Sequence, residues 1–196
     1  LALFTFCFFF YFFIHPSNVI TFTTLKKIGS TVCVWGENCT LPCTFSFGND
    51  ILIHWYYETT RNVHSYYDNR DHLGQQISQF QKRTSLFHEE IPKGNASLLL
   101  MRVQVADEGP YLCYTSTISD SSRKNIDLQV EALVREVNVV RVNDSITCSS
   151  ERIYPEPTLS WSIDPQQAHK PEVQVTEDQL YSISSTIVVN GSSNQN

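Results

Sequence analysis

The sequence predicts an all-β protein built as a sandwich or a barrel, and three observations lead to this fold class. Short apolar or alternating stretches occur at residues 51–57, 97–105 and 125–131. Polar turn clusters lie at short intervals, at residues 48–50, 68–71, 92–95 and 107–109. No window shows a sustained apolar period of the helical kind. Many short strands joined by regular turns are typical of sandwiches and barrels.

Two cysteines, a tryptophan and a tyrosine distinguish the sandwich from the barrel. Cys43 is followed by Trp55, and Tyr111 comes two positions before Cys113. An immunoglobulin sandwich places one cysteine on each sheet, packs a tryptophan of strand C on their disulfide, and has a tyrosine two residues before the second cysteine. The order and spacing therefore predict an immunoglobulin-like β-sandwich with a Cys43–Cys113 disulfide and with Trp55 and Tyr111 in its core.

The stretches around this centre agree with that fold. Leu98, Leu100 and Val103 are expected to supply the buried face of strand E. Arg83 lies where variable domains place an arginine that pairs with the aspartate of the turn before strand F, which here is Asp107. We therefore expect a structural salt bridge between Arg83 and Asp107.

The long interval between the two cysteines predicts the variable subtype. Variable-type domains carry extra strands C′ and C″ between strands C and D, and residues 61–81 supply that insert here. Residues 19–131 are assigned to this domain. Closing a loop of this length stabilises a fold by roughly 4 kcal/mol in a chain-entropy model, so losing either cysteine is expected to be severe.

A second, constant-type pattern follows a linker at residues 132–136. Cys148 ends a new strand B, Trp161 is the core tryptophan of strand C, and residues 181–189 alternate like strand E. We find no strand F or G, and no partner for Cys148, in residues 137–196, so we expect Cys148 to be unpaired. A sandwich without two of its strands exposes edges and core, and we do not expect this incomplete domain to fold stably as it stands.

The apolar run at residues 1–14 carries no charge. It is too short for a membrane-spanning helix, which needs about 20 residues, and it resembles the core of a signal peptide. Residues 1–18 are therefore assigned to a signal peptide that is truncated at its start, because an initiating Met and a basic segment are missing. A signal anchor or a buried strand is the alternative. The chain is expected to enter the secretory pathway.

The remaining cysteines suggest a second bridge. Cysteines pair in the oxidising compartments that a signal peptide implies, and of the six present Cys7 leaves with the signal. We favour a local bridge between Cys33 and Cys39. One of the two could instead stay free, or Cys39 could compete with Cys43. Four N-x-S/T sequons agree with a secreted chain: Asn38, Asn95, Asn143 and Asn190.

Charge and motifs argue against several classes of function. The formal net charge is −6, and no run of Lys and Arg of the kind that nucleic acid requires is present. The histidines are scattered, and no G-x-S-x-G, H-E-x-x-H or paired C-x-x-C pattern occurs. Asp68 and Asp71 lack the glycine and closing glutamate of a calcium loop. We predict no enzyme, cofactor, metal site, nucleic acid or small-molecule substrate.

A recognition surface is expected on the outer side of the disulfide-bearing strands. If Trp55 points inward, its neighbours His54 and Tyr56 point outward, because side chains alternate along a strand. Tyr114 points outward because Cys113 is inward. Tyrosine-rich faces suit recognition, although strands favour tyrosine anyway, and glycans or another domain could cover these. The predicted receptor-binding face comprises His54, Tyr56, His64, Tyr66 and Tyr114, where His64 and Tyr66 are expected nearby and Tyr67 is the alternative to Tyr66.

The segments around these residues resemble a known family. The stretches ENCTLPC, HWYY, VHSYY, RTSLF, GNASL and DEGPYLCYTST are similar to the first domain of the butyrophilin-like costimulatory ligands, the B-seven family of the immunoglobulin superfamily. Residues 54–117 carry most of this resemblance. The stretch IYPEPTLSW resembles the second, constant-type domain of the family.

The resemblance implies a location and a function. Family members are type I membrane proteins of the cell surface that bind receptors on T cells or natural killer cells. It implies a ligand that modulates T-cell activation, by costimulation or inhibition, with membrane anchorage expected in the full-length protein only. An innate immune receptor with an immunoglobulin ectodomain and a homophilic adhesion module are the alternatives. A tyrosine-based signalling motif in a cytoplasmic tail would favour the receptor, and self-association would favour adhesion.

Overall fold

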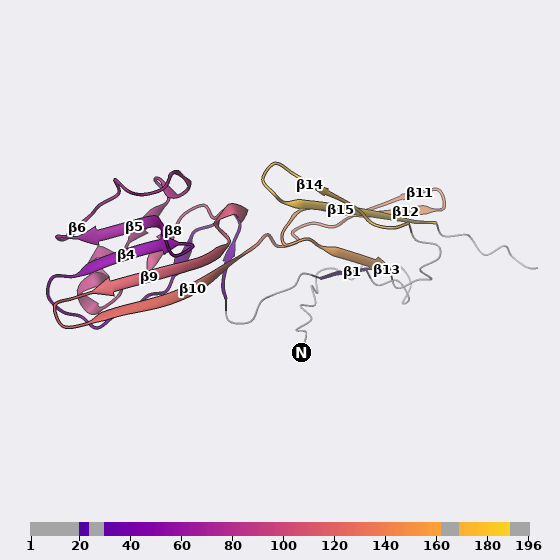
Figure 1. Ribbon diagram of the computed structural model, residues 1–196. Helices are drawn as coiled ribbons and strands as arrows, with labels where there is room; N and C mark the ends of the chain where they lie inside the picture. The colour runs from indigo at the N-terminus through magenta and orange to yellow at the C-terminus, as the bar shows by residue number, and fades with distance from the viewer. Residues whose placement is uncertain (1–19, 24–29, 162–168, 189–196) are drawn as a thin grey trace, which may run out of the picture. The chain divides into compact units, whose positions relative to one another are not determined.

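The computed structural model describes residues 20–23, 30–161 and 169–188 (Figure 1). The predicted signal peptide and Asn190 lie outside these residues. The chain divides into two compact units. The first unit is Lys27–Glu131, and the second consists of Leu1–Lys26 and Ala132–Asn196. Strands dominate both, and short 3₁₀-helices are the only helical elements among the described residues, which confirms the all-β prediction.

A six-stranded sheet forms one layer of the first unit. Its strand order is β2-β10-β9-β4-β5-β6. The strands are β2 (Thr31–Val34), β10 (Ser121–Glu131), β9 (Gly109–Ser116), β4 (Leu52–Tyr57), β5 (Arg61–Tyr67) and β6 (Arg70–Asp71). Strand β2 runs parallel to β10, and the other neighbours are antiparallel. The insert between the two cysteines thus supplies β5 and β6 at one edge.

A three-stranded sheet of order β3-β8-β7 forms the other layer. Its elements and the three 3₁₀-helices of this unit are β3 (Cys39–Leu41), β8 (Leu98–Leu100), β7 (Thr84–Leu86), η1 (Ser78–Phe80), η2 (His88–Lys93) and η3 (Val105–Asp107). Strand β8 is shorter than the predicted stretch 97–105. The backbone turns away because Arg102 has a φ of 49°, and its carbonyl accepts a hydrogen bond from Arg83.

The core between the two sheets is built around Trp55. Strand β4 alternates between partly exposed and buried residues, and Trp55 is 0% exposed. Its Nε1 donates to the carbonyl of Ala96 at 2.9 Å, which satisfies the one polar group of a buried ring. A disulfide joins Cys43 to Cys113. The hydroxyl of Tyr111 donates to the carbonyl of Asp107 at 2.8 Å, the contact expected of a tyrosine corner.

A buried ion pair closes the end of this core. The guanidinium of Arg83 donates to both carboxylate oxygens of Asp107, with 2.8 Å between Nη1 and Oδ2. Arg83 also donates to the carbonyls of Gln79, Met101 and Arg102. A buried charge is tolerated when its partners satisfy it in this way.

The second unit contains a four-stranded sheet of order β11-β12-β15-β14 and the pair β1-β13. The strands are β1 (Ile20–Thr23), β11 (Asn138–Val142), β12 (Ser145–Ile153), β13 (Thr158–Trp161), β14 (Glu172–Val175) and β15 (Tyr181–Val188). Strand β1 falls within the range predicted for the variable-type domain, but it pairs with β13. The core cluster consists of Cys148, Ile153, Leu159 and Ile183, with Trp161 packed against it. Cys148 is a free, buried thiol.

Candidate recognition surface

The outer face of the six-stranded sheet, the side turned away from the three-stranded sheet, carries an aromatic row across three strands. His54 on β4 lies directly opposite Tyr114 on β9, and Tyr114 lies opposite Arg123 on β10. The guanidinium carbon of Arg123 is 5.5 Å from the centroid of the Tyr114 ring, a cation–π distance. His54, Tyr114 and Arg123 therefore form one continuous surface.

Tyr56 extends this row along β4. Its ring centroid is 5.7 Å from that of His54, because residues two apart on a strand project to the same side. The predicted residues His54, Tyr56 and Tyr114 are all partly exposed on the outer face. The structure thus brings three of the five predicted residues together and adds Arg123, which alternation along β10 would have identified once its register with β9 was known.

A shallow open groove of about 680 Å³ continues the outer face toward β5 and β6. His54, Tyr56, Tyr67, His72 and Leu73 are among its lining residues. The rings of Tyr67 and His72 are stacked at 3.5 Å with an interplanar angle of 5°. Part of the groove wall is therefore aromatic and ordered by stacking, and Asn62, Ser65, Asp71 and Gln75 give the rest a polar lining.

Polar side chains that line this groove are in hydrogen-bonding contact with one another. Ser65 Oγ accepts a hydrogen bond from Asn62 Nδ2 at 2.8 Å and lies 2.9 Å from His54 Nδ1. Burial lowers the pKa of His54 below its ordinary value, because desolvation disfavours the charged ring. His54 is accordingly neutral at physiological pH, and the centre of the outer face carries no histidine charge.

The structure corrects the prediction for His64 and Tyr66. His64 is 1% exposed and Tyr66 is 7% exposed, and both face the interior. The reason is the register of β5: His64 pairs with the inward Trp55, and Tyr66 pairs with the inward Ile53. Residues that face each other on neighbouring strands share one side of the sheet. These two residues therefore do not belong to the candidate surface.

His64 belongs instead to a polar cluster that the sequence did not reveal and that runs from the buried His64 through the partly exposed Asp71 to the exposed His88. Asp71 Oδ1 lies 3.0 Å from Nε2 of both His64 and His88, and His64 Nδ1 lies 2.9 Å from Thr84 Oγ1. Burial acts to raise the pKa of Asp71, but the hydrogen bonds from the two histidines outweigh it, so this pKa lies below its ordinary value. The cluster links β5, β6 and β7 and has a structural role.

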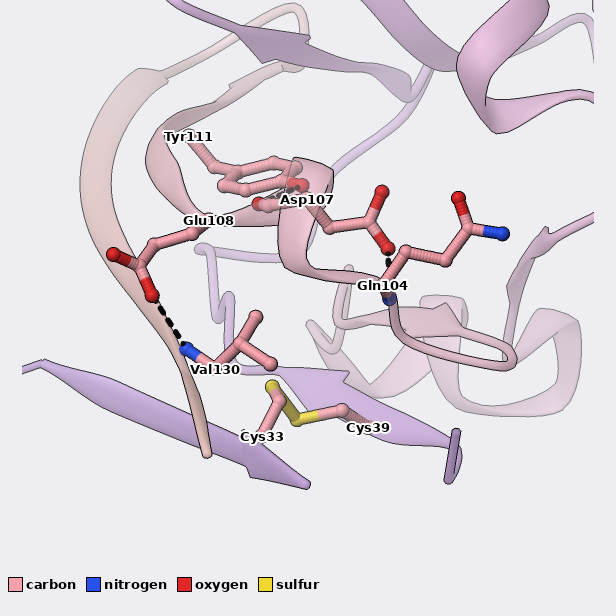
Figure 2. Close-up of a disulfide and its surroundings, with 7 residues drawn as sticks. All are labelled: Cys33, Cys39, Gln104, Asp107, Glu108, Tyr111 and Val130. Atoms are coloured by element: carbon pink, nitrogen blue, oxygen red, sulfur yellow. Dashed lines mark hydrogen bonds between the residues drawn. A yellow bond between two sulfur atoms is a disulfide. The ribbon is translucent and has the colours of Figure 1, made fainter. Parts of the chain in front are cut away.

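The opposite edge of the first unit carries a second disulfide, between Cys33 and Cys39 (Figure 2). It joins β2 of the six-stranded sheet to β3 of the three-stranded sheet. Beside it, the backbone N–H of Val130 donates to Glu108 Oε2 at 3.0 Å (Figure 2). The disulfide joins the edge strand β2 to the other sheet, and the hydrogen bond holds β10 to Glu108, which follows η3.

The predicted sequons differ in accessibility. Asn38 and Asn143 are exposed, and Asn95 is partly buried. The side-chain oxygen of Asn38 accepts from the backbone of Arg102 at 3.1 Å, and that of Asn95 accepts from the backbone of Ser97 at 3.0 Å. None of these three residues lies on the strands that form the candidate surface.

Other kinds of site are not found in the described part of the chain. Within residues 20–23, 30–161 and 169–188, no group of three or more His, Cys, Asp or Glu side chains is placed to hold a metal ion. The same residues contain no helix long and apolar enough to cross a membrane.

Known proteins share both halves of this architecture. The chain matches the immunoglobulin V-set domain over residues 29–131 and the CD80-like C2-set immunoglobulin domain over residues 127–196. It is 35% identical to the HERV-H LTR-associating protein 2 of Homo sapiens, over 80% of this chain and 39% of the relative. It is 34% identical to the V-set domain-containing T-cell activation inhibitor 1 of Rattus norvegicus, over 90% of this chain and 64% of the relative. The chain thus spans less than two thirds of the length of either relative.

A solved structure agrees with these relatives. The human B7-H4 IgV-like domain superposes with a TM-score of 0.50 at 31% identity, over 58% of this chain and 97% of that domain. The matched families consist of binding and signalling domains, in agreement with the prediction that the chain is not an enzyme. The V-set match alone covers more than half of the sequence, and the family resemblance predicted from the sequence is confirmed. The chain belongs to the B7 family of the immunoglobulin superfamily.

Proposed function

We propose that the full-length protein is a cell-surface ligand that binds a receptor on T cells or natural killer cells and thereby modulates T-cell activation. Its family membership supports this role, as does a relative that is named for inhibiting T-cell activation. Secretory entry, anchorage in a membrane and glycosylation at Asn38, Asn95, Asn143 and Asn190 are parts of the same proposal.

The observation that carries the proposal is the aromatic row on the outer face. His54, Tyr56 and Tyr114 are partly exposed on adjacent strands, and Arg123 extends the row. Tyrosine and arginine are the residue types that dominate binding energy in protein interfaces. The rings sit on a rigid sheet, so little conformational entropy is lost when a partner covers them.

Cell binding tests this proposal directly. The chain would be secreted as a fusion to an antibody Fc fragment and titrated on lymphocytes by flow cytometry. The variants Tyr56→Ala and Tyr114→Ala are each expected to weaken binding by at least about tenfold, the loss of a moderate interface anchor. The matched control is Tyr181→Ala, which removes a tyrosine from the second unit. Unchanged binding by both variants, with thermal unfolding like that of the parent chain, would contradict the assigned surface.

The effect on T cells can be measured with the same proteins. Immobilised parent chain is expected to change the proliferation of T cells stimulated through their antigen receptor, and the double variant Tyr56→Ala/Tyr114→Ala is expected to change it less. Self-association of the chain in sedimentation, without lymphocyte binding, would favour a homophilic adhesion module instead.

A further inference from the structure

Two exposed apolar side chains lie at one end of the first unit. Phe47, in the loop before β4, is 57% exposed, and Ile118, in the loop between β9 and β10, is 74% exposed. The loops meet at this end because Leu52, at the start of β4, pairs with Ser116, at the end of β9. We call residues 45–50 and 117–120 the tip loops. They adjoin the outer face, since Tyr114 precedes the second loop on β9.

The tip loops are fastened to each other. The backbone N–H of Ile118 donates to the carbonyl of Asn49 at 3.1 Å. A Cβ atom at Gly48 would lie 2.9 Å from Cβ and Oγ1 of Thr117, so the side chain of Thr117 packs directly on the backbone of Gly48. Within the second loop, the backbone N–H of Thr117 donates to the carbonyl of Asp120 at 2.8 Å. The two apolar side chains are therefore presented by a pre-organised support.

A single exposed apolar residue is ordinary on a protein surface, but this pair has further features in common. Phe47 and Ile118 come from separate segments that the hydrogen bond between Ile118 and Asn49 joins, and neither side chain contributes to the buried core. A rigid support lowers the entropy cost of inserting them into a partner. The arrangement therefore suits a pair of anchors.

The charge around the anchors indicates the chemistry of the partner. Asp50 and Asp120 are exposed in the tip loops, which contain no Lys or Arg, and the next basic residues along the chain, Arg123 and Lys124, lie on β10. An acidic rim repels a second identical tip, and it repels the negative surface of an anionic membrane. A protein cleft with an apolar floor and Lys or Arg at its edge is complementary in both respects.

We propose that the tip loops insert Phe47 and Ile118 into an apolar cleft, bordered by Lys or Arg, on the receptor that contacts the outer face. This extends the receptor footprint from the sheet onto the loops, and it rests on the proposed function. The outer face supplies stacking area, the two anchors fill the cleft, and the acidic rim attracts its basic edge.

Binding of the Fc fusion to lymphocytes tests the inference. The variants Phe47→Ser and Ile118→Ser are each expected to weaken binding by about tenfold or more, mainly through faster dissociation. The double variant Asp50→Asn/Asp120→Asn is expected to slow association at low ionic strength, because rim charges act mostly on the association rate. Phe87→Ser is the matched control, since Phe87 is exposed but follows β7 of the three-stranded sheet.

The outcomes separate the two proposals. If the tip variants bind like the parent chain while Tyr56→Ala and Tyr114→Ala lose binding, the proposal for the tip loops is contradicted. The outer face then remains the proposed receptor-binding surface. If the parent chain binds no lymphocytes, the proposed function fails, and the inference fails with it. Binding to phosphatidylserine vesicles that Phe47→Ser abolishes would assign the tip to a lipid surface and overturn a protein cleft.

Discussion

Both units contain a cysteine followed by a core tryptophan, but the surroundings of the two tryptophans differ. In the first unit, Trp55 is fully buried beside the Cys43–Cys113 disulfide, and its ring nitrogen donates to the backbone. In the second unit, Trp161 is only partly buried, donates to Ser185 Oγ at 2.9 Å, and packs near the free thiol of Cys148. A cysteine and a tryptophan at this spacing therefore recur in both units, but how deeply the tryptophan is buried depends on the side chains that pack around it.

The side chains around each tryptophan show the same difference. The first unit adds a buried ion pair and a second disulfide to its core. The second unit has a cluster of four buried residues, while its strands β11 and β14 carry exposed valines: Val139, Val140, Val142, Val173 and Val175. We therefore expect the two units to unfold in two separate transitions, and we expect the first unit to be the more stable.

The largest expected effect is the loss of the disulfide in the first unit. Cys113→Ala opens a loop whose ends are 70 positions apart and is expected to destabilise this unit by roughly 4 kcal/mol. Cys148→Ala, the equivalent change in the second unit, is expected to cost only about 1 kcal/mol. Urea unfolding, followed by tryptophan fluorescence, measures both. If the two variants lost equal free energies of unfolding, the disulfide would not account for the difference in stability between the units.

The buried ion pair is expected to have the next largest effect. Asp107→Asn leaves the guanidinium of Arg83 without its carboxylate and is expected to cost about 3 kcal/mol, all of it in the transition of the first unit. The control is Glu58→Gln, which removes an exposed partner of Arg61 and is expected to change stability by less than about 1 kcal/mol. Calorimetry would contradict this if Asp107→Asn lowered the transition of the second unit as well.

The smallest expected effect concerns the rate at which the Cys148 thiol reacts, and not the free energy of unfolding. Burial raises the pKa of the Cys148 thiol to about 11, and the thiolate is the reactive form. Labelling with a thiol-specific disulfide reagent at pH 8 is expected to be roughly a hundred times slower in buffer than in 6 M urea, where the pKa returns to about 8.5. Similar rates in the two solvents would mean that the second unit is not packed around Cys148.

Alternation and spacing predicted the centre of the fold well. They placed Trp55 inward and His54, Tyr56 and Tyr114 outward, because the side-chain direction along a strand depends only on whether a position is odd or even. The expectation that His64 and Tyr66 lie near this face was wrong, because alternation within β4 and β9 does not determine the direction of side chains on β5. Alternation could not supply the register between β4 and β5, which contains an irregularity after Trp55, and a shift of one residue moves a side chain to the other face.

Other features depend on residues far apart in the sequence. Asp71 joins His64 and His88 only after β6 folds against β5. The tip loops meet only because β4 and β9 are neighbours in the sheet. Neither arrangement has a signal in local composition, because each partner is an ordinary polar or apolar residue in its own segment.

The sequence by itself determined the all-β class, the immunoglobulin pattern of cysteine, tryptophan and tyrosine, and the family, because each of these depends on order and spacing along one chain. Only the tertiary structure decided which residues share the outer face, where the Asp71 cluster forms, and that the loops carrying Phe47 and Ile118 meet at one end of the first unit. Those outcomes depend on strand register and on contacts between distant loops, which are set when the two sheets pack against each other.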